Sequence, residues 1–415
     1  MRIAFGILVA VVLAGGGLVL VARREPDGII TNFSWGARTR EARLLAERIR
    51  AAEERSGDVR GVYMTTVVAN DRGRAATRLR KGILELLDET EVNGVVIDVK
   101  EVDGGLVITD ELRGLIRELH GEGVWVIARQ VVFKDSWQER EHPEWYLRRK
   151  NGSIWRDNRG GSWLDPASRD VWAYQLNAAK SASDAGFDEI QFDYVRFPSD
   201  GNIADIVYPV YDGLRPRYEV MRSFFAYLGD ELGAYRPELI LSADLFGYVA
   251  IHEADLGIGQ RLRDIGESFD YVSLMVYPSH YYGGFEVPAD PGRNLPALFF
   301  PYHAADVSRT AVAHPYDVVY RSLLIAEDVL SGRATTTNTV ATSTPSASPT
   351  EEGKRRAKLR PWLQDFDLGV DSSRGIRYDA AKVRAEIDAA EAAGASGWLL
   401  WSPDNVYTRE ALKPE

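Results

Sequence analysis

The chain has 415 residues, 45% of them hydrophobic and 27% charged, so it can bury a large core and is neither disordered nor fibrous. Its formal net charge of −11 argues against a nucleic-acid partner, because phosphate binding needs a basic surface, and makes a neutral or basic ligand easier to accommodate. The chain has no cysteine, which excludes disulfides, thiolate metal sites and a cysteine nucleophile.

The N-terminal segment has the composition of a membrane span. Residues 3–22 form an almost unbroken apolar run with arginines at both ends, long enough to cross a bilayer as a helix. We interpret residues 1–24 as a transmembrane anchor. A cleaved signal peptide is the alternative, although residues 20–22 resemble a cleavage site only weakly. We therefore expect a single-pass protein of the cell membrane with its body outside the cytoplasm, or a secreted protein if the segment is cleaved.

The next segment, residues 25–57, is predicted to be a linker followed by a surface helix. Apolar residues recur at helical spacing among Arg and Glu between positions 37 and 56. From residue 58 onward, strand and helix patterns alternate. Strands are expected at residues 61–68, 94–100, 124–129, 188–198, 239–247, 271–277, 359–365 and 397–403. Helices are expected at residues 72–87, 110–120, 167–185 and 214–233, and from about residues 259, 316 and 380.

Eight strand–helix repeats predict a closed (β/α)8 TIM barrel of the α/β class over residues 58–415, preceded by the N-terminal transmembrane helix. An open doubly wound sheet is the weaker alternative, because no glycine-rich phosphate turn follows the first strand. One connection, at about residues 331–358, is rich in Thr, Ser, Ala and Pro. Because it leads from a helix into a strand, we expect a disordered insert at the barrel face opposite the site.

The two longest loops that lead from a strand into a helix are expected at residues 132–166 and 278–315. Such loops surround the active site of a barrel. Both are rich in aromatic side chains, which suits a walled cleft over the barrel mouth and favours a carbohydrate ligand. These aromatic residues are Trp137, Trp145, Tyr146, Trp155 and Trp163 in the first loop and Tyr281, Tyr282, Phe285, Phe299 and Phe300 in the second.

The stretch at residues 188–198 reads as a buried strand that ends in a carboxylate and a guanidinium, Asp193 and Arg196. Gly186 marks the end of the helix before it. Ligands of α/β barrels bind at the C-terminal ends of the strands, so a charged pair there is more often functional than structural. The structural alternative is a buried Asp–Arg ion pair that holds a loop.

The ends of the other strands also carry polar residues, and together the strand ends form an unusually polar set of candidate site residues. The set consists of Asp98, Lys100, Arg129, Asp193, Arg196, Asp244, Tyr277, His280, Gln364, Trp401 and Asp404. Two carboxylates on neighbouring strand ends are what glycosidic hydrolysis requires, one to protonate the leaving oxygen and one to attack the anomeric carbon or activate water. We predict that Asp193 and Asp244 are catalytic, with Asp193 ionised beside Arg196 and Asp244 as the proton donor. The other residues of the set are predicted to bind substrate.

Several of these residues also have a structural interpretation. Asp98 and Lys100 could form an ion pair, Asp244 could cap the helix that follows it, and Trp401 could belong to the core. No metal or cofactor is predicted, because His280 is the sole histidine close to a strand end and the chain has no HxH or HExxH spacing. A serine nucleophile also lacks its GxSxG motif.

Five motifs of the barrel region are similar to those of a bacterial glycoside hydrolase domain family that has been classed as a domain of unknown function. They lie at residues 163–166 (WLDP), 186–198 (GFDEIQFDYVRFP), 243–247 (ADLFG), 275–281 (MVYPSHY) and 362–366 (WLQDF). The resemblance covers nearly the whole barrel and implies a TIM-barrel fold of the glycosidase type. The role of Asp193 as nucleophile is inferred by analogy with barrel glycosidases that use a carboxylate on strand four.

The chain is therefore expected to be a glycoside hydrolase that cleaves a polysaccharide of the cell envelope or the environment. The alternative is a non-catalytic carbohydrate-binding barrel at the cell surface. The two carboxylates favour the enzyme, because a binder could use amides and aromatic rings at a lower desolvation cost. A metal-dependent deacetylase would need an Asp with two His ligands, which the positions of the histidines disfavour.

Overall fold

The computed structural model describes residues 24–25, 28–29, 35–252, 254–333 and 356–415. The chain divides into two units, Met1–Arg50 and Ala51–Glu415. The predicted membrane span at residues 3–22 lies outside the described residues. Within the described ranges, none of the helices is both long and apolar enough to cross a membrane.

The first unit contains β1 (Arg24–Glu25), which pairs antiparallel with β2 (Gly28–Ile29), and most of α1 (Trp35–Arg55). The helix α1 covers the surface helix predicted between positions 37 and 56. Most side chains at positions 40–50 are exposed, as the many Arg and Glu of this segment predict.

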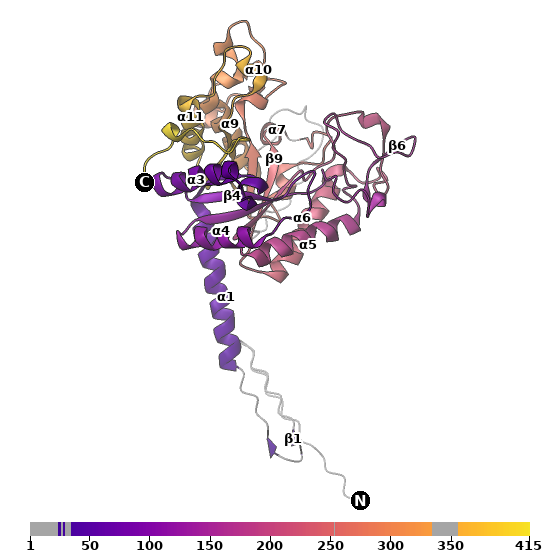
Figure 1. The fold of residues 1–415 in the computed structure, drawn as a ribbon. Coiled ribbons are helices and arrows are strands. Elements are labelled where there is room, and N and C mark those ends of the chain that lie inside the picture. The colour runs from indigo at the N-terminus through magenta and orange to yellow at the C-terminus, as the bar shows by residue number, and fades with distance from the viewer. Residues whose placement is uncertain (1–23, 26–27, 30–34, 253, 334–355) are drawn as a thin grey trace, which may run out of the picture. The chain divides into compact units, whose positions relative to one another are not determined.

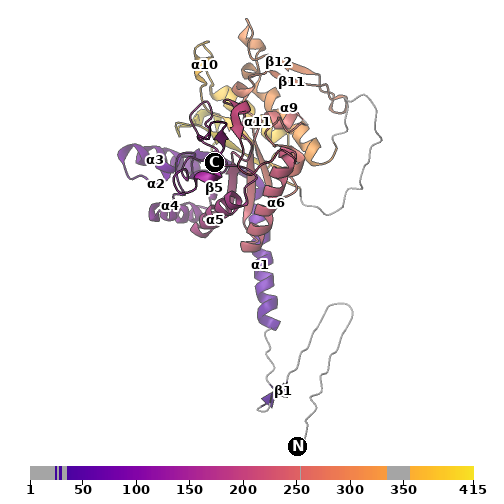
Figure 2. The same ribbon diagram turned by 90° about the vertical axis from the view of Figure 1, so that its right-hand side faces the viewer.

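The second unit is a closed barrel of parallel strands (Figures 1 and 2). Hydrogen-bonded neighbours run in the order β3, β4, β5, β7, β9, β10, β13 with β14, and β15, which pairs back with β3. Their bounds are Val59–Met64, Gly94–Lys100, Trp125–Val131, Glu189–Asp193, Ile240–Phe246, Tyr271–Met275, Lys358–Leu359 with Trp362–Gln364, and Gly397–Trp401. The (β/α)8 prediction is confirmed, with one refinement. The seventh strand is split into β13 and β14 around Pro361, which has no N–H for the ladder.

Helices cover the outside of the barrel. Figure 1 shows α3 to α6 along the strands, and Figure 2 shows α9 beside α11. The helices between successive strands are α3 (Arg74–Glu89), α4 (Asp110–Gly121), α5 (Arg169–Ala185), α6 (Arg217–Tyr235), α8 (Leu262–Ile265), α9 (Pro315–Leu330) and α11 (Ala380–Ala392). The helix expected from about residue 259 is thus reduced to the single turn α8. Short helices α2 (Thr66–Asn70), α7 (Tyr248–Ile251) and α10 (Gly369–Ser372), and short strands β6 (Arg148–Arg149), β8 (Ile206–Val207), β11 (Phe285–Val287) and β12 (Leu298–Phe300), lie in the loops.

The helix that precedes β7 shows how local sequence sets these boundaries. The Ser168 hydroxyl accepts a hydrogen bond from the Val171 N–H and caps the start of α5. Gly186 ends the helix in the left-handed region at φ 108°, which a residue without a Cβ adopts readily. The chain then enters β7 with every residue of Glu189–Asp193 buried.

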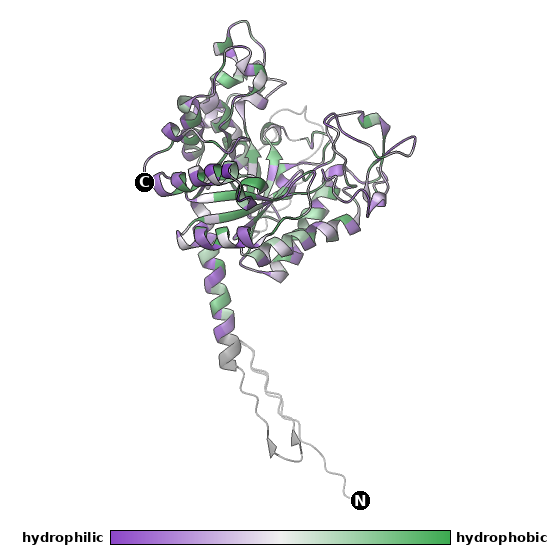
Figure 3. Cartoon of the chain, viewed as in Figure 1, coloured by the Kyte–Doolittle hydropathy of each residue, from purple (hydrophilic) through white to green (hydrophobic). Residues whose placement is uncertain are grey.

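Alternation along the strands creates two apolar layers. Outward residues such as Val62, Val95 and Phe192 pack against the helices, and inward residues such as Tyr63, Val96 and Ile127 fill the barrel. Figure 3 shows mainly hydrophobic strands inside helices whose surfaces carry hydrophilic residues. Each buried aliphatic side chain contributes roughly 1.5–3 kcal/mol relative to an exposed one, so this pattern is the main source of stability.

The connection between α9 and β13 contains the predicted Thr/Ser/Pro-rich insert. Because α9 ends at Leu330 and β13 begins at Lys358, this is a helix-to-strand connection, as predicted. Residues 334–355 lie outside the described residues.

Candidate active site

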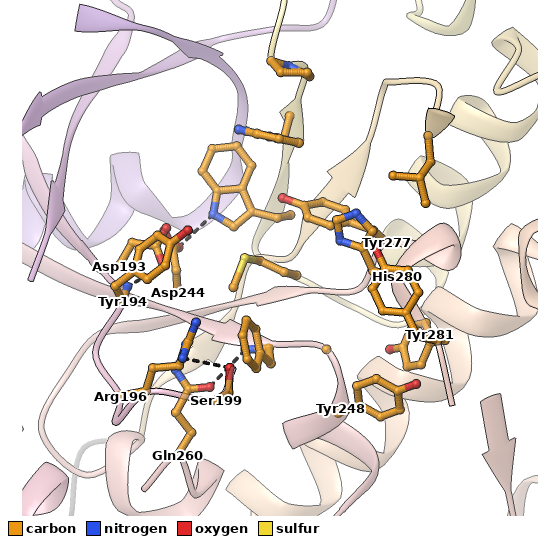
Figure 4. Close-up of a pocket in the computed structure, with 18 of the residues that line it drawn as sticks. Asp193, Tyr194, Arg196, Ser199, Asp244, Tyr248, Gln260, Tyr277, His280 and Tyr281 are labelled. Atoms are coloured by element: carbon orange, nitrogen blue, oxygen red, sulfur yellow. Dashed lines mark hydrogen bonds between the residues drawn. The ribbon is translucent and has the colours of Figure 1, made fainter. Parts of the chain in front are cut away.

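A cavity of about 650 Å³ lies at the C-terminal ends of the barrel strands. Ligands of α/β barrels bind at this face, and the candidate site residues are predicted to lie there. Its lining comes from β5, β7, β9, β10, β14 and β15 and from the loops after them. In Figure 4, Asp193, Asp244 and Arg196 lie on one side of the cavity, and Tyr277, His280 and Tyr281 lie opposite.

At the floor of the cavity, the guanidinium of Arg129 contacts three carboxyl groups. Its Nη1 donates to Asp98 Oδ1 at 2.6 Å, its Nη2 donates to Asp193 Oδ2, and its Nε lies 3.6 Å from Asp244 Oδ2. These residues occupy inward positions near the ends of β4, β5, β7 and β9, four adjacent strands. Burial opposes the charge of Arg129, but the carboxylates of Asp98 and Asp193 outweigh it and raise the pKa of Arg129 well above its usual value.

Asp193 is the last residue of β7, and its position is set by a sharp change of backbone direction. The next residue, Tyr194, has a φ of 54°, in the left-handed region that is uncommon for a residue with a side chain. This conformation lets the Tyr194 N–H donate to Asp193 Oδ1 at 2.5 Å. Asp193 therefore accepts one hydrogen bond from its own turn and one from Arg129.

Asp244, near the end of β9, has different surroundings. Its Oδ1 accepts a hydrogen bond from Trp362 Nε1 at 2.8 Å, and its Oδ2 has no hydrogen-bond partner in the described part of the chain. Burial and the neighbouring charge of Asp193 raise the pKa of Asp244 well above its usual value, although Arg129 and Trp362 oppose the shift. Asp244 is thus a carboxyl group that keeps its proton at a pH where ordinary carboxyls have lost theirs.

Asp98 lies behind Arg129 rather than on the cavity wall. Its Oδ2 accepts a hydrogen bond from the Tyr63 hydroxyl, and its side chain is almost fully buried. Burial raises the pKa of Asp98, and the opposite charge of Arg129 counteracts the shift. Asp98 and Tyr63 therefore hold the guanidinium in place from the side away from the cavity.

Aromatic rings form the opposite wall. Tyr277 and Trp401 stack with ring centroids 5.9 Å apart, and Phe366 packs edge-on against both. His280 lies 5.2 Å from the Tyr277 ring. Burial, with a smaller effect of the Arg159 charge, lowers the pKa of His280 to about 4, so this imidazole is neutral at pH 7. The wall is flat and apolar with polar tips, as sugar-binding surfaces are.

The family model described as "Putative glycosyl hydrolase domain" matches residues 61–407 of this chain. The chain belongs to this family. The match runs from the first barrel strand to beyond the last, and it confirms the resemblance inferred from the motifs. Membership supports a glycosidase role. No curated protein matches the chain.

One solved structure supports the same fold, and two more are similar over part of their length or at a lower TM-score. The glycoside hydrolase domain of PgaB (BpsB) from Bordetella bronchiseptica has 13% identity and a TM-score of 0.56, over 84% of this chain and 95% of that one. At this identity the likeness shows the barrel fold alone. A hypothetical protein from Ruminiclostridium thermocellum is 32% identical over 44% of this chain and 96% of that one, with a TM-score of 0.38. The spore cortex-lytic enzyme SleL of Bacillus megaterium is 13% identical over 85% and 72% of the two chains, with a TM-score of 0.45.

The predicted site residues of this glycosyl hydrolase domain fall into two groups. Those that line the cavity are Arg129, Asp193, Arg196, Asp244, Tyr277, His280 and Trp401. Four others do not line it. Asp98 lies behind Arg129, and Asp404 is exposed on the loop after β15. Gln364 holds the start of the loop after β10 through Ser279.

Lys100 points away from the cavity, contrary to the prediction. Its Nζ lies 2.6 Å from Asp135 Oδ2 and donates to the Val131 carbonyl at 2.8 Å, and both charged side chains are fully buried. The reason is a register shift between Asp98 and Lys100, which breaks the alternation that would have directed both inward. The suggested Asp98–Lys100 ion pair is therefore wrong.

Arg196 is not the cation beside Asp193. In the described part of the chain, no carboxylate lies within 4 Å of Arg196, because the left-handed turn at Tyr194 carries the chain away from Asp193. Arg129, from the neighbouring strand, takes that place. The helix-capping alternative for Asp244 is also wrong, since α7 begins after Gly247 without a side-chain cap.

Several lining residues escaped the sequence prediction. Tyr282 had been expected in the aromatic wall, but Lys134, Arg159, Tyr194, Gln260 and Trp362 had not been assigned to the site. Trp362 could have been found, because it occupies an inward position of the seventh strand. The aromatic residues of the loop at 132–166 do not line the cavity, since Tyr146, Trp155 and Trp163 are buried in the core.

Proposed function

We propose that this protein hydrolyses glycosidic bonds of a cell-envelope or environmental polysaccharide, using Asp193 and Asp244 as its two carboxyl groups. The observation that carries the proposal is their unlike surroundings on either side of Arg129. Asp193 accepts two hydrogen bonds, whereas Asp244, which lines the same cavity, has a raised pKa and a buried Oδ2 without a hydrogen-bond partner among the described residues. A buried carboxyl with a raised pKa is suited to be the acid, and a carboxyl held by a cation is suited to be the nucleophile or base.

In the proposed reaction, Asp244 is the general acid. Its proton passes to the glycosidic oxygen as the bond from that oxygen to the anomeric carbon breaks, and the bonding electron pair stays with the leaving oxygen. In one route, Asp193 attacks the anomeric carbon to form a glycosyl–enzyme ester, and a water molecule that gives its proton to Asp244 then hydrolyses this ester. In the other route, Asp193 removes a proton from the water that attacks the anomeric carbon directly. The positive charge of Arg129 offsets part of the negative charge of the neighbouring carboxylates while the anomeric carbon becomes positive. NMR of the product anomers distinguishes the two routes for Asp193.

The aromatic wall supports a sugar as the ligand. Tyr277, Phe366 and Trp401 present ring faces and edges in the same cavity as the carboxyl groups, and neutral His280 adds no charge. Apolar faces of pyranose rings pack on such surfaces while sugar hydroxyls bond to polar tips.

Substitution of the two carboxyls tests the proposal. Asp193→Asn should lower turnover of every polysaccharide substrate by at least about a thousandfold, because no other group replaces the nucleophile or base. Asp244→Asn should lower turnover of polysaccharide about a hundredfold to ten-thousandfold, but should spare aryl glycosides with good leaving groups, which need little protonation. Release of reducing ends and of the aryl group measures both.

Asp404→Asn is the matched control, because it makes the same chemical change at a strand end but outside the cavity. It should leave turnover unchanged. Wild-type turnover by Asp193→Asn would refute its assignment. If the wild-type protein binds polysaccharides but never releases reducing ends, it is a carbohydrate-binding barrel instead.

We also propose that the protein is a single-pass protein of the cell membrane with its barrel outside the cytoplasm. The support is the apolar run at residues 3–22 with its flanking arginines. A polysaccharide of the envelope or the environment would be accessible to a barrel held there.

A further inference from the structure

Arg196 is a buried cation that has no acidic partner among the residues described by the structure. Its side chain lines the cavity, and the residue is only 5% exposed. Its Nη1 donates to the Phe197 carbonyl and the Ser199 hydroxyl, both at 3.1 Å. Within the described ranges, no carboxylate lies within 4 Å of it, whereas Arg129 contacts three carboxylates and Lys134 pairs with Asp157 at 2.8 Å.

Packing alone does not account for this arrangement. The guanidinium lies over the rings of Trp163 and Phe246, 4.8 and 4.5 Å from their centroids. Such contacts contribute about 0.5–2 kcal/mol each, whereas burying a charge without a counter-ion costs several kcal/mol. Burial lowers the pKa of Arg196, which is the electrostatic sign of that cost. A guanidinium keeps its charge in proteins, so an anion that entered the cavity would meet a desolvated cation.

The neighbouring charges do not neutralise Arg196. Asp193 is held by Arg129, and Asp200, at the cavity rim, uses its Oδ1 to accept the Asn158 N–H. A second cation, Arg159, also lines the cavity and is exposed, and the structure gives its guanidinium no acidic partner among the residues it describes. In addition to the carboxyl pair and Arg129, the cavity is therefore lined by one buried positive charge and one exposed positive charge.

We propose that the cavity binds a saccharide whose sugar ring carries a carboxylate, and that Arg196 is the residue that recognises this carboxylate. The inference rests on the proposed function for the sugar and on Arg196 for the carboxylate. A planar guanidinium can donate two parallel hydrogen bonds to a carboxylate. Arg196 uses its Nη1 for hydrogen bonds within the protein, so Nε and Nη2 are the nitrogens that would donate to the carboxylate. The net charge of −11 does not prevent this, because long-range repulsion is screened within about 10 Å at 0.1 M salt.

Ligand-observed saturation-transfer NMR on the full chain tests the proposal without any turnover. The probes are the methyl glycosides of glucuronate, galacturonate and mannuronate, each compared with its neutral parent sugar and with the 6-phosphate of that sugar. At least one uronate should bind ten to a hundred times more tightly than its neutral parent, the range expected for a charge-assisted hydrogen bond. Arg196→Gln should remove that preference while binding of the neutral sugar persists, and Arg196→Lys should retain part of it.

Equal or weaker binding of the uronates, or no detectable binding of any of them, would overturn the proposal. Tighter binding of the 6-phosphates would assign the subsite to a phosphorylated sugar and overturn the carboxylate. If Arg196→Gln does not fold, the wild-type preference and Arg196→Lys still decide. Hydrolysis of neutral polysaccharide without uronate binding would refute the subsite alone, and uronate binding without any hydrolysis would refute the proposed function alone.

Discussion

At the scale of single residues, the protonation of the carboxyl groups in the site is set by their burial from water. Arg129 faces three carboxyl groups, and two of these, Asp98 and Asp244, have raised pKa values because they are buried. A proton held on Asp244 brings the charge of this cluster closer to balance. The acid of the proposed reaction is thus a consequence of packing one cation among three buried acids.

His280 offers a test of the cavity's burial that needs no substrate. The pKa of His280 is about 4 in the folded chain, below the ordinary value of 6.5. Between pH 4 and pH 6.5, His280 is therefore protonated in the unfolded chain but not in the folded chain. Its contribution to stability is present above pH 6.5 and is lost as the pH falls toward 4, by up to about 3 kcal/mol. His280→Gln should therefore lose less stability than the wild type between pH 7.5 and 4.5 in urea unfolding. An identical pH dependence in the two proteins would show that His280 is accessible to solvent.

For some of the predicted site residues, strand position alone was enough to predict that the side chain lines the cavity. Asp193, Asp244, Arg129 and Trp401 occupy inward positions at strand ends and line the cavity. Lys100 and Arg196 were assigned wrong neighbours, because each follows a backbone irregularity, a register shift and a left-handed residue respectively. Such irregularities depend on tertiary contacts and have no signal in the pattern of apolar residues.

At the scale of elements, the strands are held together at the end of the barrel opposite the cavity by a buried ion pair. Arg360, between β13 and β14, donates to Glu189 at 2.7 Å, and both side chains are fully buried. Arg360 also donates to the Ser56 carbonyl at 2.7 Å, and Trp125 Nε1 donates to Glu189 at 3.0 Å. This network spans β5, β7 and the interrupted seventh strand.

Replacing one partner of this ion pair should lower the free energy of unfolding more than replacing both partners. Arg360→Met leaves Glu189 as an uncompensated buried charge and should lower the free energy of unfolding by about 3–5 kcal/mol. Adding Glu189→Gln should restore a large part of that loss, because the orphaned charge is gone. Lys81→Met, which breaks an exposed ion pair on α3, is the control and should cost less than about 1 kcal/mol. Urea unfolding measures all three, and additive losses in the double variant would show that the two groups are not coupled.

At the scale of the whole molecule, the alternation of strands and helices was enough to predict the barrel. The eight repeats, each with an apolar strand and a glycine or polar turn, leave few other arrangements. The sequence could not predict which aromatic side chains of the loops face the cavity. Trp155 and Trp163 are of the residue type on which sugars stack, but they pack into the core. Their indole N–H groups donate hydrogen bonds to the Asn202 carbonyl and the Asp157 carboxylate.

The division into two units predicts what removal of the N-terminal segment should do. If residues 3–22 anchor the chain, the full-length protein should sediment with membranes, and protease added to intact cells should digest the barrel. A variant without residues 1–34 keeps α1 and the whole of Ala51–Glu415. It should remain soluble and unfold at the same temperature as the detergent-solubilised full-length protein, since every strand pair of the barrel is retained. Recovery of the full-length gene product from the soluble fraction, with its N-terminus cut near residue 22, would instead establish a cleaved signal peptide.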